Sequence, residues 1–171
     1  AERLLPPQYK KFMPMLVMVV LTFFGLFRYE IGTDYDWYIV LFDTVKIDDL
    51  YPEPTFLLLV EFLHQFHFSY QVMFIAYELP IMLLLWSGIR YYTKDTEIQI
   101  LIVALYYCLQ YFFSLNGIRQ GLSMVLIFWG YRYCLERSLW KYLLVVALAA
   151  SMHYSAVVAA VLYFVPTRVF S

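Results

Sequence analysis

Residues 70–89 read YQVMFIAYELPIMLLLWSGI, a run of twenty positions that contains one charged residue, Glu78. An α-helix rises about 1.5 Å per residue, so about 20 apolar residues cross the roughly 30 Å hydrocarbon core of a bilayer. Pro80 lies in the middle of the run, where it removes a helical hydrogen bond and kinks the helix. The stretch predicts a transmembrane helix and indicates that the chain folds in lipid.

Further apolar runs flank this one on both sides. They cover residues 12–27, 98–115, 122–135 and 142–165, whereas the run at 55–68 is shorter and is interrupted by Glu61, His64 and His67. Hydrophobic residues make up 63% of the 171 positions and charged residues 15%, against about 45–50% and about 25% in soluble domains. We therefore expect one domain over residues 1–171, an all-α polytopic transmembrane bundle. Soluble enzymes are excluded, and the net charge of −1 leaves no basic field for nucleic acid.

The distribution of Lys and Arg, which favour the cytoplasmic side of short loops, selects between two topologies. If 55–68 crosses the bilayer, five of the twelve basic residues lie inside, and if it does not cross, eight do. We therefore expect about five spans, near residues 12–28, 70–89, 98–115, 120–135 and 142–165. Residues 1–11 are then cytoplasmic. Residues 29–69 form an extracytoplasmic loop that carries an interfacial or re-entrant helix at 55–68 and a short helix around Trp37–Phe42.

Two arginines are predicted at the outer ends of spans. Arg28 closes the first span, and Arg119 lies in the sequence NGIRQG at 116–121, whose glycines let backbone N–H groups approach an anion. Arginines from two spans can form a fork that suits phosphate oxygens. For Arg28 the alternative is a helix-end arginine that extends to the lipid headgroups.

Carboxylates and a histidine complete the polar set. Asp34 and Asp36 lie in one turn and offer a general base or hydrogen bonds to sugar hydroxyls, with Tyr35 and Tyr38 as stacking surfaces, although a solvated turn explains the same pattern. His153 falls inside a predicted span, where an ionisable side chain is costly and usually functional. A histidine bonded to a serine or a backbone carbonyl is the alternative there. No cysteine or histidine spacing predicts a metal or haem site.

Four motifs carry a resemblance to a known family. They are Arg28-Tyr29-Glu30-Ile31-Gly32-Thr33-Asp34-Tyr35 with Tyr38, Glu53-Pro54-Thr55-Phe56, Gly117-Ile118-Arg119-Gln120-Gly121-Leu122, and Ala149-Ala150-Ser151-Met152-His153-Tyr154-Ser155-Ala156. In this order they resemble the EpsG family of exopolysaccharide and O-antigen polymerases, which are Wzy-like membrane glycosyltransferases. Thr55 and Ser123 stand where the family commonly has glycine and alanine. Family members usually have a span before the first one here and several after the histidine motif, so the resemblance implies a partial chain.

The resemblance implies a multi-pass polymerase of the inner membrane. It would join polyprenyl-pyrophosphate-linked oligosaccharide repeat units at the outer face, without a cofactor. Its partners would be the lipid-linked glycan donor and acceptor, the bilayer, a flippase and a chain-length regulator. The alternatives are an ion-coupled transporter that uses Glu78 and His153, and a non-catalytic subunit of a polysaccharide export complex.

The resemblance also implies roles for the polar residues. Arg28, Arg119 and Gln120 would bind the substrate pyrophosphate, and Tyr35, Asp36 and Tyr38 would contact the sugars. Asp34 and His153 compete for the acid–base role. We favour Asp34 as the base and His153 as a polar contact to the pyrophosphate or the acceptor.

The topology gives a first testable prediction. Residues 29–54, 116–121 and 166–171 should be extracytoplasmic, and 90–97 and 132–141 cytoplasmic, because this assignment places most basic residues inside. Single cysteines in a variant that lacks Cys108 and Cys134, labelled with an impermeant thiol reagent, check each loop. Labelling from the outside of a cysteine at position 94 would contradict the assignment.

Overall fold

The computed structural model describes residues 12–165, apart from 48 and 50, and within them the chain is all-helical. Its elements are α2 (Met13–Leu26), α3 (Tyr35–Thr44), α4 (Pro54–Gln65), α5 (Tyr70–Tyr92), α6 (Thr96–Tyr106), the π-helix η1 (Tyr107–Tyr111), α7 (Phe112–Asn116), α8 (Ile118–Gly130), α9 (Arg132–Leu135), α10 (Leu139–Met152) and the 3₁₀-helix η2 (Tyr154–Phe164). The predicted fold class, all-α, is confirmed for this part of the chain. Residues 1–11 and 166–171, which carry two of the topology predictions, lie outside it.

Among the residues that the structure describes, two helical segments are long and apolar enough to cross a membrane. They are α5, with 23 residues, and the continuous segment Thr96–Asn116, with 21 residues, which joins α6, η1 and α7. The apolar helices α2, α10 and η2 are shorter. The helix lengths therefore support two of the five predicted spans. A bundle with five full spans stays a prediction.

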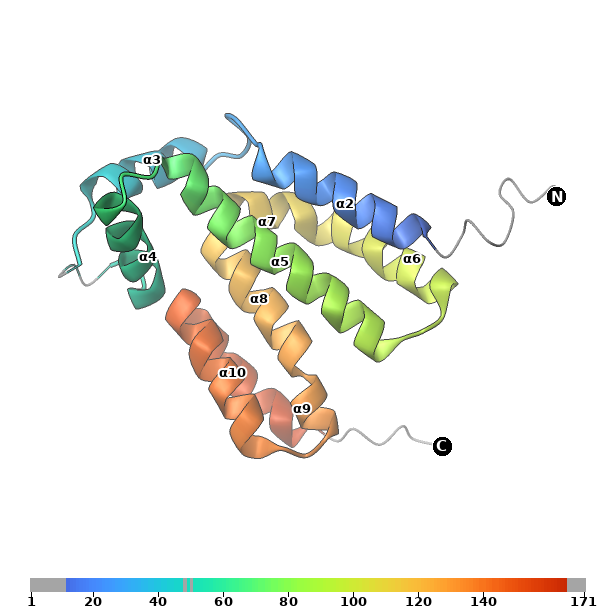
Figure 1. The fold of residues 1–171 in the computed structure, drawn as a ribbon. Helices are drawn as coiled ribbons and strands as arrows, with labels where there is room; N and C mark the ends of the chain where they lie inside the picture. Colours follow the sequence, from blue (N-terminus) through green and yellow to red (C-terminus); the bar gives the residue numbers. More distant parts are fainter. Residues whose placement is uncertain (1–11, 48, 50, 166–171) are drawn as a thin grey trace.

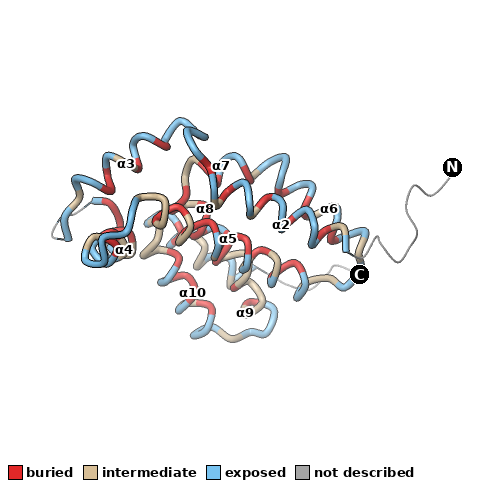
Figure 2. Tube along the Cα trace, turned by 45° about the horizontal axis from the view of Figure 1, so that its top comes forward, coloured by how far each residue is buried: buried red, intermediate tan, exposed pale blue. Residues whose placement is uncertain are grey.

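The long helices lie side by side in a bundle, and the two short helices α3 and α4 lie at one end of it (Figure 1). Helix α5 packs against α8 and α2, and α10 packs against α8 and η2. Buried positions follow the facing sides of these helices (Figure 2). The outer sides are apolar as well: Leu109, Leu144 and Val158 are each 70% exposed or more. Large apolar surfaces of this kind are expected where lipid covers a protein.

The short helices α3 and α4 agree with the predicted helices at 37–42 and 55–68. Pro54 occupies the first turn of α4, where its fixed φ and missing N–H are tolerated. Phe56, Val60 and Leu63 recur at helical spacing and are buried on one face. Each helix therefore packs an amphipathic face inward against the end of the bundle.

The predicted span at 142–165 is wrong as a continuous helix, because the chain reverses at His153. The helix α10 ends at Met152, His153 is extended with φ −157° and ψ 117°, and η2 packs back along α10. The Tyr142 hydroxyl donates to the Ala159 carbonyl at 2.7 Å, and the Tyr142 and Tyr163 rings stack at 6.3 Å. At about 1.5 Å per α-helical and 2.0 Å per 3₁₀ residue, both arms are about 21–22 Å long.

The predicted polar break at 116–121 is also narrower than expected. Only Gly117 interrupts the helical path, with φ −89° and ψ 66°, and α8 begins at Ile118. Arg119 and Gln120 therefore lie in the first turn of α8 rather than in a loop. A Cβ atom at Gly121 would lie 2.8 Å from the Ser114 Cβ, so the glycine lets α7 and α8 meet closely at this turn.

The hairpin of α10 and η2 predicts proximity between residues that a single helix would separate. Cysteines at positions 142 and 163, in a variant lacking Cys108 and Cys134, should be joined by a short bifunctional thiol reagent. A continuous helix would hold these positions roughly 32 Å apart at about 1.5 Å per residue. Mass spectrometry of the crosslinked peptides is the measurement, with the two single-cysteine variants as controls. Absence of the crosslink in the double variant would favour the straight span.

Candidate functional site

A buried carboxylate, Glu53, joins three parts of the chain at the end of the bundle that carries α3 and α4. Glu53 precedes Pro54, which disfavours helical backbone, and its φ of −60° and ψ of 153° are extended. The residue is 2% exposed. One carboxylate oxygen, Oε2, forms an ion pair with Nη1 of Arg119. The other, Oε1, lies 2.8 Å from Nδ1 of His153 and accepts a hydrogen bond from the Tyr154 backbone N–H at 3.4 Å.

Arg119 is held by its position in the first turn of α8. Its Nη2 donates to the Tyr51 hydroxyl at 2.9 Å, in addition to the ion pair with Glu53. The guanidinium carbon lies 5.2 Å from the Tyr51 ring centroid, 5.4 Å from that of Phe56 and 5.8 Å from that of Tyr38. Burial raises the pKa of the Tyr38 phenol, so this ring remains neutral beside the cation. The positive charge of Arg119 is thus surrounded by aromatic faces and balanced by one carboxylate.

His153 reaches the same carboxylate from the turn between α10 and η2. The Thr55 hydroxyl donates to the Ser151 carbonyl, which fastens the first turn of α4 to the end of α10. An ionised carboxylate only accepts hydrogen bonds, so the pairing assigns a ring proton to Nδ1, and in the neutral imidazole Nε2 is then the acceptor. The imidazole is 29% exposed, against 3% for the Glu53 side chain. His153 is therefore the member of the pair that an incoming molecule can reach.

Arg28, the second predicted anion ligand, follows α2 directly and is 2% exposed. Its Nη1 donates to the Leu115 carbonyl, and its guanidinium carbon lies 4.1 Å from the Phe74 ring centroid. Within the described part of the chain, Nε and Nη2 of Arg28 have no hydrogen-bond partner. Arg28 is therefore a buried cation with unused donors.

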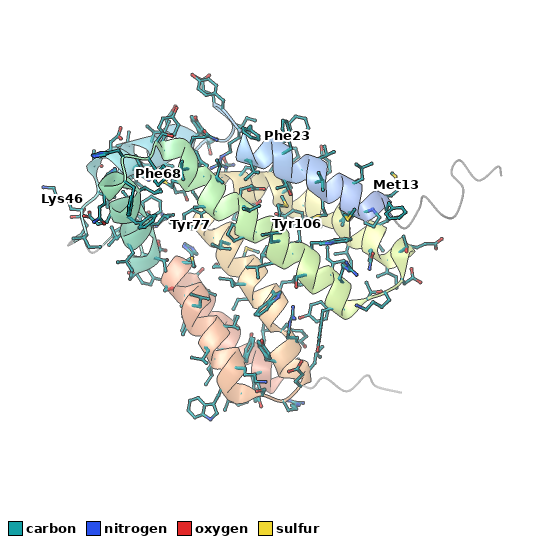
Figure 3. All side chains as sticks on the ribbon, in the orientation of Figure 1. Met13, Phe23, Lys46, Phe68, Tyr77 and Tyr106 are labelled. Carbon is teal, nitrogen blue, oxygen red and sulfur yellow. The ribbon has the colours of Figure 1, made fainter. Side chains whose placement is uncertain are left out.

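One aromatic cluster, formed by Tyr35, Tyr38, Phe56 and Phe74, connects the two arginines. Tyr35 stacks on Phe74 at 5.2 Å, while Tyr38 contacts Phe74 at 6.3 Å and Phe56 at 6.1 Å. Tyr77 of α5, labelled in Figure 3, extends the contacts at 6.3 Å from Phe56. Arg28 lies over Phe74 and Arg119 near Tyr38 and Phe56, so both predicted anion ligands meet this cluster.

The other residues selected from the sequence lie in different surroundings. Asp34 precedes α3 and is exposed, and its Oδ1 accepts from the Thr33 hydroxyl at 3.2 Å. Asp36 is exposed in the first turn of α3, and Gln120 is half-buried in α8. Tyr35 and Tyr38 are both 4% exposed, in the core. Among the residues that the structure places, no hydrogen bond or ion pair links Asp34, Asp36 or Gln120 to either arginine or to His153.

Glu53 is the residue that the sequence prediction missed. It belongs to the quoted motif Glu53-Pro54-Thr55-Phe56, but it was one of seven carboxylates between residues 29 and 54. The signal that separates it from the others is Pro54. The proline fixes an extended residue before a helix whose next apolar position, Phe56, is fully buried.

The fold and this centre define an all-helical protein with a buried charged centre at one end and a large apolar exterior. The sequence model of the EpsG family matches residues 11–171, and the chain belongs to this family. Family membership and the apolar helices together indicate a membrane protein of polysaccharide biosynthesis. No curated protein and no solved structure matches the chain.

The arrangement around Glu53 predicts that its charge stabilises the fold. Glu53→Gln keeps the size of the side chain but leaves Arg119 buried without its counter-ion. Breaking a buried ion pair by removing one partner costs roughly 3–5 kcal/mol, so we expect a lower unfolding midpoint. Thermal unfolding of the purified protein in detergent is the measurement. Glu61→Gln is the matched control, because Glu61 is an exposed carboxylate in α4, the helix that follows Glu53. Equal midpoints for the two variants would show that Glu53 carries no structural charge.

Proposed function

We propose that the protein is a polymerase that joins polyprenyl-pyrophosphate-linked oligosaccharide repeat units at the outer face of the inner membrane. In the reaction, a sugar hydroxyl of the acceptor attacks the anomeric carbon of the donor glycan. A new C–O glycosidic bond forms, and the bond between the anomeric carbon and the pyrophosphate oxygen breaks. The hydroxyl proton passes to a base, and the bond electrons leave with the polyprenyl pyrophosphate.

The observation that carries this proposal is the bridge formed by Glu53. Three of the four family motifs supply its members, from positions 53, 119 and 153, and the first motif supplies Arg28 and Tyr38 beside them. Residues up to about a hundred positions apart are thus gathered into one charged centre. A core that served packing alone would not need a buried acid, a buried arginine and a histidine in contact.

The arginines suit the leaving group of this reaction. Charge develops on the pyrophosphate as the glycosidic bond forms, and preorganised donors in a water-poor site stabilise such charge strongly. Nε and Nη2 of Arg28 and Nε of Arg119 are buried donors without partners in the described structure. We propose that phosphate oxygens occupy these positions, as the resemblance implied for both residues.

His153 is the base that the geometry favours. Glu53 holds Nδ1–H, so the lone pair of Nε2 can accept the proton of the acceptor hydroxyl, and the carboxylate stabilises the resulting imidazolium. Asp34, which we favoured on sequence grounds, remains the competing proposal, since a carboxylate at the start of α3 is exposed and free to meet a sugar. The sugar contacts proposed for Asp36, Tyr35, Tyr38 and Gln120 are further proposals.

The experiment uses the full chain in proteoliposomes with purified lipid-linked repeat units, and the product is a glycan ladder. His153→Gln should keep substrate binding but lower turnover by about 10²–10⁴, because glutamine donates a hydrogen bond yet cannot take the proton. Asp34→Asn should leave turnover near its starting value. The opposite pattern would assign the base to Asp34. Absence of a ladder from units that the unsubstituted protein binds would refute the polymerase and favour a carrier or a non-catalytic subunit.

A further inference from the structure

A largely apolar groove, lined also by Glu97 of α6, runs along α2 and the helical segment formed by α6, η1 and α7. It consists of two cavities of about 550 and 410 Å³, and both are lined by Val17 of α2 and Tyr107 of η1. The first extends from these residues to Met13 and Ala104, and the second extends to Phe24 and Leu115. In Figure 3, Met13 and Phe23 mark the two ends of α2, so the groove follows most of this helix.

The groove ends at residues that contact Arg28 or lie near it in the sequence. Leu115 lines its last part, and the carbonyl of Leu115 accepts the hydrogen bond from Nη1 of Arg28. Ile31, three residues after Arg28, lines the same end. Arg28 is 2% exposed, and its Nε and Nη2 are donors without partners in the described structure. The groove thus ends at a residue that is hydrogen-bonded to a buried cation. This cation also interacts with the buried carboxylate of Glu78, and its Nε and Nη2 have no hydrogen-bond partner in the described structure.

The π-helix η1 shapes the wall of this groove. A π-helical turn inserts extra backbone into an α-helix, and such turns occur often at functional sites. Tyr107 and Tyr111, the first and last residues of η1, both line the groove. The Tyr111 hydroxyl donates to the Leu21 carbonyl at 2.8 Å, which fixes η1 to the opposite wall on α2. This buried hydrogen bond joins the two walls of the groove.

We propose that this groove binds the polyprenyl chain of a lipid-linked substrate, with the first phosphate at Arg28. The proposal rests on the proposed function and assigns the lipid part of that substrate. The ligand that matches the groove has one anionic head and one long apolar tail. A packed protein helix would bring no anion to the free nitrogen atoms of Arg28. A two-chain phospholipid would place one acyl chain outside the single path along α2.

The test uses a probe that carries no sugar, so that binding is measured apart from polymerisation. A polyprenyl pyrophosphate with a photoreactive diazirine near the far end of its chain is added to the full-length protein in detergent, and labelled peptides are identified by mass spectrometry. We expect labelling on α2 around Met13 and Val17 or on α6 around Ala104. An Arg28→Gln variant should bind the probe about tenfold or more weakly, because it loses the charge-assisted bonds to phosphate.

A second experiment blocks the groove with a large side chain introduced in its wall. Ala104→Trp should lower labelling about tenfold, whereas Leu105→Trp, at an adjacent exposed position that does not line the groove, should not change it. Labelling of the unsubstituted protein keeps the proposal testable if the Ala104 variant fails to fold. Equal competition by phosphatidylglycerol would overturn the proposal in favour of ordinary lipid. Crosslinks from this face to another protein helix, with no labelling by the probe, would overturn it in favour of a packing surface.

The same measurements separate the groove from the polymerase reaction. Labelling in the groove by a protein that makes no glycan ladder would refute the proposed function and leave the lipid site standing. Normal polymerisation of long-chain substrates by a folded Ala104→Trp protein would refute the groove and leave the function standing.

Discussion

The carboxylate of Glu53 neutralises a buried arginine, and the closed end of the bundle is arranged around that contact. Removing two charges from water costs several kcal/mol per ion, and the cost is recovered only where geometry and further hydrogen bonds are good. Here Arg119 gains the carboxylate, the Tyr51 hydroxyl and aromatic faces, while Glu53 gains His153 and a backbone N–H. Replacing a buried ion pair with well-packed apolar residues is often neutral or stabilising, so stability alone does not account for this pair.

Each member of this centre lies where regular helix stops or starts. Glu53 precedes α4, Arg119 lies in the first turn of α8 after Gly117, and His153 separates α10 from η2. Backbone outside a regular helix must find hydrogen-bond partners, and in lipid it is tolerated only where protein or a wet cavity supplies them. These three interruptions lie together at one end of the bundle, and Glu53, Arg119 and His153 contact one another there.

The helices themselves were largely predictable, because apolar runs and their lengths determine them. The segments α5 and Thr96–Asn116, and the short helices α3 and α4, follow directly from those runs. The reversal of the chain at His153 was not predictable. The sequence SMHYS at 151–155 contains neither glycine nor proline, and it has the pattern of a continuous span. Its cause lies in tertiary contacts, namely the bond of His153 to Glu53 and that of Tyr142 to Ala159.

The residues of the candidate site were predictable only in part. Arg28, Arg119 and His153 stand out because a charged or titratable side chain is unusual among apolar neighbours. Glu53 does not stand out, since it ends an acidic stretch that reads as a solvated loop. Its burial depends on α4 folding back against α10, a contact between residues about a hundred positions apart that no local pattern encodes.

The two arginines are not equivalent, and the difference gives the centre a direction. Arg119 is already paired with Glu53, so an anion that approaches it competes with an internal carboxylate. Arg28 has no ion pair in the described structure and keeps unused donors at the end of the apolar groove. An anion would find two nitrogen donors without partners at Arg28 but one at Arg119, and at either arginine it would meet a buried carboxylate, Glu78 or Glu53. Under the proposed function, a lipid-linked pyrophosphate that enters along the groove would be held at Arg28, on the aromatic cluster that also meets Arg119.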